Sequence, residues 1–119
     1  MAEKNHQNPK KYSEIFFKFA APLTEGIMHD KEESTSMLNL GQAIWNKAVA
    51  DDFPEHPNSK KISMLFPLAK AGYDKELISK FTERKQQLFG NDNFFIVKQN
   101  LHVNAEGNLI INVSALDVE

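Results

Sequence analysis

The feature that most constrains this fold is an alternation of apolar and polar residues near the C-terminus. It spans residues 97–104 and resumes over residues 109–115. A period of two is typical of β-strands with one buried face and one face in water. The intervening Asn104–Asn108 segment contains turn-forming residues, including Gly107. The pattern therefore predicts an antiparallel β-hairpin between Phe94 and Leu116.

Pairing across the turn gives a register for this hairpin. One face is apolar apart from a single Gln, in the pairs Val103–Leu109, Leu101–Ile111, Gln99–Val113 and Val97–Ala115. We expect this face to lie on the rest of the protein. The opposite face is polar in its middle part, at Lys98, Asn100 and His102, and is predicted to be solvated.

The base of the hairpin has a different character. The same register places Phe94 opposite Val118 and Ile96 opposite Leu116, so apolar residues occupy both faces there. Such a base must be covered by another part of this chain or by a partner. Two lone strands also have two unpaired edges, which must be covered or used. Phe94, Ile96, Leu116 and Val118 are therefore a candidate interface.

Helical periodicity precedes the hairpin in four segments. The first is predicted to begin at Ser13 and to end or kink at Pro22. The second ends near Ala50, and it has three alternative starting residues: Asp30, Ser34 or Thr35. It carries Trp45, the only Trp of the chain, on a broad apolar face.

The third and fourth helical segments follow a loop with two prolines. Asn58 or Ser59 is expected to cap the third segment, and Gly72 to end it. Asp74 is expected to cap the fourth, which ends at Gly90. The fold class is therefore α+β, with about four helical segments in a small bundle and a C-terminal antiparallel hairpin packed on it.

Length and composition suit one domain. The chain has 119 residues, a length that suits one domain and is too short for two. Hydrophobic residues make up 41% of it, which is enough for one core. Residues 1–11 are polar and are predicted to form a flexible tail before a single domain at residues 12–119.

The absence of Cys excludes disulfides, thiolate metal sites and cysteine nucleophiles. The polar N-terminus does not resemble a signal peptide, and no stretch is apolar enough for a membrane span. We therefore expect a cytoplasmic protein without membrane association.

Two groups of residues carry the types found in metal or acid–base sites. Asp51, Asp52, Glu55 and His56 share one loop, but this loop lacks the spacing of a calcium site. The four histidines, at positions 6, 29, 56 and 102, form no pair at helical spacing. We predict no catalytic residue, metal or cofactor from these patterns.

Basic residues suggest a second class of partner. Lys60 and Lys61 lie in the third segment, and Arg84 and Lys85 lie in the fourth. They could contact nucleic acid. However, the net charge is −2 and acidic residues interleave with the basic ones on the fourth segment, so nucleic-acid binding is disfavoured.

Three functional hypotheses result from these observations. The first is a non-enzymatic module that binds a protein partner, or itself as a homodimer, through the hairpin edge or base. The second is a nucleic-acid-associated regulator that uses Lys60, Lys61, Arg84 and Lys85. The third is an enzyme with a cleft near Trp45 and the loop at residues 51–56.

Overall fold

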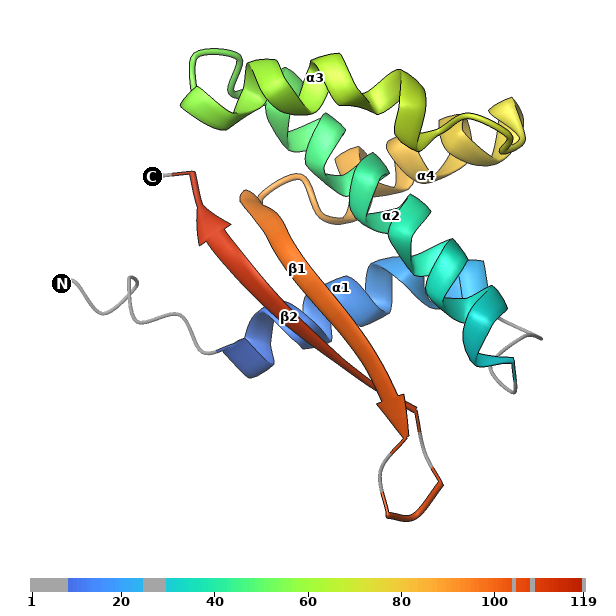
Figure 1. The fold of residues 1–119 in the computed structure, drawn as a ribbon. Helices are drawn as coiled ribbons and strands as arrows, with labels where there is room; N and C mark the ends of the chain where they lie inside the picture. The colour runs from blue at the N-terminus through green and yellow to red at the C-terminus, as the bar shows by residue number, and fades with distance from the viewer. Residues whose placement is uncertain (1–8, 25–29, 104, 108, 119) are drawn as a thin grey trace, which may run out of the picture.

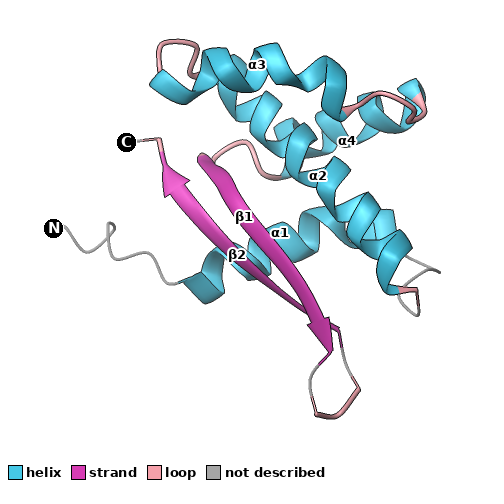
Figure 2. Ribbon diagram, viewed as in Figure 1, coloured by secondary structure: helices cyan, strands magenta, loops and turns pink. Residues whose placement is uncertain are grey.

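The computed structural model describes residues 9–24, 30–103, 105–107 and 109–118. Within them, four helices precede a two-stranded antiparallel sheet (Figure 1 and Figure 2), which confirms the α+β class. The elements are α1 (Pro9–Thr24), α2 (Lys31–Asp52), α3 (Pro57–Ala69), α4 (Lys75–Leu88), β1 (Phe94–Val103) and β2 (Leu109–Asp117). None of the described helices is both long and apolar enough to cross a membrane.

Helices α2, α3 and α4 each begin at a side chain that caps the first turn, and the cap of α3 is not one of the predicted residues. Asp74 caps α4 as expected, and Asp30, one of the three alternatives for the start of α2, caps that helix; each accepts a backbone N–H of the first turn. The predicted cap of α3 is wrong. His56 has that role, because its Nδ1 accepts the N–H of Asn58 at 3.1 Å, and Pro57 suits the first helical position, where no N–H is needed.

Helix α1 begins before its predicted cap. It starts at Pro9, so residues 9–11 of the predicted tail are helical, while residues 1–8 lie outside the described residues. Ser13 is therefore inside the helix. Its hydroxyl is not a cap but accepts the backbone N–H of Val113 in β2 at 2.9 Å. The polar residue that suggested a helix start is used for a tertiary contact.

An aromatic cluster occupies the centre of the core. The Trp45 ring is fully buried, and its centroid lies 5.2, 5.8 and 5.0 Å from those of Phe19, Phe89 and Phe94. These rings come from α1, α2, the end of α4 and β1. The cluster thus joins the helices to the hairpin and fills the space beside Trp45, where the sequence suggested a cleft.

The hairpin register is confirmed in the distal part and wrong at the base. Val103, Leu101 and Gln99 pair with Leu109, Ile111 and Val113 as predicted. A β-bulge between Ile96 and Lys98 then shifts the pairing, so that the base pairs are Ile96–Ala115, Phe95–Leu116 and Phe94–Asp117. Val97 is the extra residue, and 63% of its surface is exposed.

The bulge changes which candidate interface residues are accessible. Phe94 and Ile96 are buried in the core, so their predicted place on the outer face is wrong. Val118 is half-buried against the core, and Leu116 is exposed. The cover of the hairpin base is therefore largely supplied by other parts of this chain, which was one of the two alternatives.

Candidate functional site

The edge of β1 is covered at its base by side chains of α2. The Oδ1 of Asn46 accepts the N–H of Ile96 at 2.7 Å, and its Nδ2 donates to the Ile96 carbonyl at 3.0 Å. Gln42 donates to the same carbonyl at 3.1 Å. The indole N–H of Trp45 donates to the carbonyl of Phe94 at 2.8 Å. These groups are thus unavailable for pairing with another strand.

The edge of β2 is covered by α1. Ser13 accepts the N–H of Val113, and the Tyr12 hydroxyl donates to the Asp117 carboxylate at 2.9 Å. Outward-facing backbone groups recur at every second residue of an antiparallel edge. Because the N–H of Val113 faces outward, the backbone of its partner Gln99 does too, and Leu101 and Ile111 follow towards the turn. Use of the edge stays a prediction for this distal part, which begins at Gln99 on β1.

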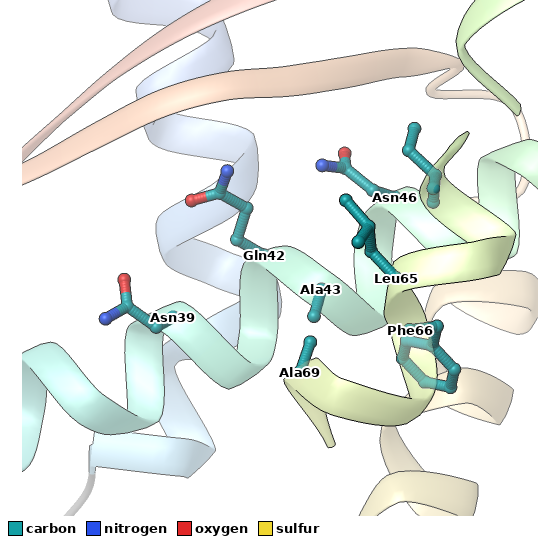
Figure 3. Close-up of a pocket in the computed structure, with 8 residues that line it drawn as sticks. Asn39, Gln42, Ala43, Asn46, Leu65, Phe66 and Ala69 are labelled. Atoms are coloured by element: carbon teal, nitrogen blue, oxygen red, sulfur yellow. The ribbon is translucent and has the colours of Figure 1, made fainter. Parts of the chain in front are cut away.

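An open groove lies between α2 and α3 and has a volume of about 340 Å³. Figure 3 shows its lining, which comprises Asn39, Gln42, Ala43 and Asn46 of α2 and Ile62, Leu65, Phe66 and Ala69 of α3. The α2 amides already have partners: besides the bonds to Ile96, Asn39 accepts a bond of 2.7 Å from the side chain of Gln99. The α3 side of the groove is apolar.

The outer face of α3 continues this apolar surface. Met64, Leu65 and Leu68 are 68, 49 and 77% exposed. Ser59 is the only buried residue of this helix. We call Met64, Leu65 and Leu68, together with the groove beside them, the α3 surface. It is the place where the described residues expose large apolar side chains closest together along one element.

Lysines lie at both ends of the α3 surface. Lys60 and Lys61, the fourth and fifth residues of the helix, are exposed, and no described residue forms an ion pair with either. Lys70 follows the last turn, where its Nζ lies 5.3 Å from the centroid of the Phe66 ring. The helix itself contains no acidic residue. The α3 surface is therefore apolar in the middle and basic at its ends.

The structure does not bring the four predicted nucleic-acid contacts onto one surface. Lys85 is 1% exposed, and its Nζ donates to the Phe89 carbonyl at 2.8 Å and lies 4.6 Å from the Trp45 ring centroid. Its assignment to a binding surface is therefore wrong. The pattern of charged neighbours on α4 suggested solvent, but the fold places this position against the aromatic cluster.

Burial lowers the pKa of Lys85, and the charges of Asp52 and Asp92 partly oppose that shift. The neighbouring Arg84 donates to the carbonyls of Phe19 and Lys18 at 3.0 and 2.8 Å, which joins α4 to α1. Both basic residues of α4 thus have structural partners, and only Lys60 and Lys61 of the predicted group are freely exposed.

The described residues hold no group of three or more His, Asp or Glu side chains placed for a metal ion. His56 caps α3 and packs on Phe95, with 4.9 Å between ring centroids. His102 lies on the exposed face of β1, where it meets Asn112. His6 and His29 lie outside the described residues. Aromatic rings fill the surroundings of Trp45.

Comparison with known proteins finds no matching family model, no matching curated protein and no matching solved structure. Functional inference therefore depends on the surfaces described above. Sequence reasoning missed the α3 surface because Leu65 shares helical spacing with Ile62, Phe66 and Ala69, a pattern typical of a buried helix face. The signal that could have indicated it is the absence of acidic residues from an apolar helix that begins with two lysines.

Proposed function

We propose that this protein is a non-enzymatic interaction module that binds another protein through the α3 surface. The observation that carries the proposal is the exposure of Met64, Leu65 and Leu68 on adjacent turns of one helix. Burial of a side chain of this size is worth about 1.5–3 kcal/mol, so three together could supply much of a specific interface. Exposed apolar groups of this kind mark interaction sites in folded proteins.

The position of α3 supports the same proposal. In Figure 1 this helix lies on the outside of α2, away from the hairpin and α1. Its inner residues Ile62 and Phe66 pack on the core, while its outer residues contact little of the chain. A helix held in place from one side presents a rigid surface, which lowers the entropic cost of binding.

The test is cross-linking in an extract of the source cells followed by mass spectrometry. Leu68→Glu introduces a charge at the centre of the α3 surface and should abolish the specific cross-links. Leu88→Glu is the matched control, because Leu88 is 62% exposed on α4, outside that surface. Circular dichroism should show both variants folded. The same cross-links in Leu68→Glu as in the wild type would contradict the proposal.

A second candidate is self-association through the hairpin, favoured by the exposure of Val97 and Leu116 near its base. Leu116 is the residue of the interface predicted from the sequence that stays exposed, and Val97 lies near it only because of the bulge. Light scattering over a range of concentrations measures it directly. A dimer that Leu116→Glu converts to a monomer would support this candidate, and a monomer at all concentrations would remove it.

A further inference from the structure

We infer that the partner of the α3 surface is an acidic amphipathic helix, in which an apolar stripe is flanked by Asp or Glu residues. The inference rests on the proposed function and adds the chemistry of the partner. It comes from the juxtaposition of exposed Met64, Leu65 and Leu68 with Lys60 and Lys61 on one helix.

The spacing along α3 suits a helical partner. Lys60, Met64 and Leu68 are separated by four residues each, so they follow one line along the helix, and Leu65 lies four residues after Lys61. A second helix laid along this line would meet apolar side chains in the middle and ammonium groups at one end. The adjoining groove can receive its apolar side chains beside Leu65 and Phe66.

The charges indicate an acidic partner. Lys60 and Lys61 are the fourth and fifth residues of α3, near its N-terminus, where the helix dipole does not favour a positive charge. Lys70 adds a third positive charge at the other end. The acidic residues that flank α3 in the sequence are Asp51, Asp52 and Glu55 before it and Asp74 and Glu76 after it, and Asp51 is paired with Lys47. Carboxylates of a partner would relieve the uncompensated positive charge on the helix.

The same charges argue against two other occupants. An α3 helix of a second copy, packed antiparallel, would place Lys70 beside Lys60 and Lys61 of its partner, and like charges repel. Anionic membranes usually recruit clusters of roughly four to eight basic residues. Lys47 also lies beside Phe66, but it is paired with Asp51, so three lysines without an ion pair among the described residues remain at the α3 surface, in a chain of net charge −2. A protein helix is therefore the occupant that the surface favours.

The test uses synthetic peptides of one design, stapled to be helical, with Leu at every third or fourth position. The flanking residues are Glu in the probe and Gln or Lys in the two controls. Exposed ion pairs contribute roughly twofold each, so three of them predict binding of the Glu peptide on the order of tenfold tighter than the Gln peptide. High salt should reduce this difference.

Protein variants locate the effect. Lys60→Glu with Lys61→Glu should reverse the order of the Glu and Lys peptides, and the fold should hold because both side chains are exposed and Glu forms helices about as readily as Lys. Lys18→Glu with Lys98→Glu makes the same change in net charge at exposed sites on α1 and β1 and should preserve the order. Leu68→Glu should abolish binding of all three peptides.

If the Glu and Gln peptides bind the wild type equally well and Leu68→Glu binds neither, the inference of an acidic partner is overturned. The α3 surface then remains a docking site. If no peptide binds, the inference of an acidic helical partner is also overturned. The proposed interaction function is then tested on its own by the cross-linking of Leu68→Glu. Binding to phosphatidylserine vesicles in place of the peptides would overturn it in favour of a membrane surface.

Discussion

The side-chain amide of Asn46 substitutes for a neighbouring strand at Ile96, because it accepts the backbone N–H at 2.7 Å and donates to the carbonyl at 3.0 Å. A two-stranded sheet has no interior strand, so each of its edges needs partners. Here α2 supplies them through Asn46 and Gln42, and α1 supplies Ser13 to Val113. The hairpin is thus bonded to the helices through its backbone as well as packed on them.

Asn46→Ala should cost about 2 kcal/mol of unfolding free energy, because the Ile96 N–H loses its acceptor in a buried position. Gln42→Ala should cost less than about 1 kcal/mol, because Asn46 still donates to the same carbonyl. Urea denaturation of the two variants measures the difference. Equal losses would show that the amide of Asn46 has no special role at the β1 edge.

Substitutions at neighbouring residues test the bulge. Val97→Lys should change stability by less than about 0.5 kcal/mol, because the side chain already lies in solvent. Ile96→Lys should cost more than about 3 kcal/mol, because it would bury an unpaired charge. The unbulged register predicts the opposite order. Thermal unfolding of both variants distinguishes the two registers.

Lys85 should make stability rise with pH on the alkaline side. Its pKa in the folded protein is lower than 10.5, the value expected when it is exposed. Between these two pKa values the unfolded chain binds more protons, so unfolding becomes less favourable as pH increases. In Lys85→Met this contribution is absent, and the variant should be as stable as the wild type or about 1 kcal/mol more stable near pH 7.

The measurement is the unfolding free energy of the wild type and Lys85→Met from about pH 7 to about pH 10. The wild type should gain stability relative to the variant as pH increases. A constant difference across this range would mean that Lys85 has the same pKa in both states. Lys80→Met, at an exposed position on the same helix, is the control for the loss of one lysine charge.

Tyr12 should have the opposite effect at higher pH. Its pKa is raised above 10.0, first by burial and then by its hydrogen bond to Asp117 and the charge of that carboxylate. The folded state therefore holds the proton longer, and its stabilising contribution is present below pH 10.0 and lost as the pH rises further. Tyr12→Phe should lose about 1 kcal/mol at neutral pH and show a weaker alkaline decline.

Spectroscopic titration of the tyrosine absorbance provides an independent measure of this effect. The chain has two tyrosines, Tyr12 and Tyr73, so removing Tyr73 leaves the absorbance of Tyr12 alone. A variant with Tyr73→Phe should retain a tyrosine that titrates above the ordinary value. Titration of that remaining Tyr12 near 10.0 would contradict the predicted shift.

Local patterns predicted the elements that depend on local chemistry. Asp74 caps α4 because a carboxylate at that point can accept the free N–H groups of the first turn. Gly72 has a φ of +88° after α3, a conformation that Gly adopts without strain. The hairpin pairs Leu101–Ile111 and Gln99–Val113 follow from the turn and the alternation, both of which lie within a short segment.

Other features had no local signal. Four apolar residues follow one another at Phe94, Phe95, Ile96 and Val97. Without alternating polar residues, the sequence does not show which of them face inward or where a bulge interrupts the strand. Lys85 follows other charged residues and resembled part of a solvated face, but the aromatic cluster covers it. Leu88 lies seven residues after the buried Phe81, a spacing that favours the inner face of a helix, yet it is 62% exposed.

The sequence by itself determined the order of the helices, most of their ends and the pairing of the distal hairpin, because capping and periodicity act over a few residues. Only the tertiary structure decided that Asn46 and Ser13 cover the hairpin edges, that Lys85 is buried and that Leu68 is exposed. Each of these depends on which distant element lies against the residue. Apolar character shows that a side chain favours burial, but the packing of the whole chain decides which ones remain accessible to a partner.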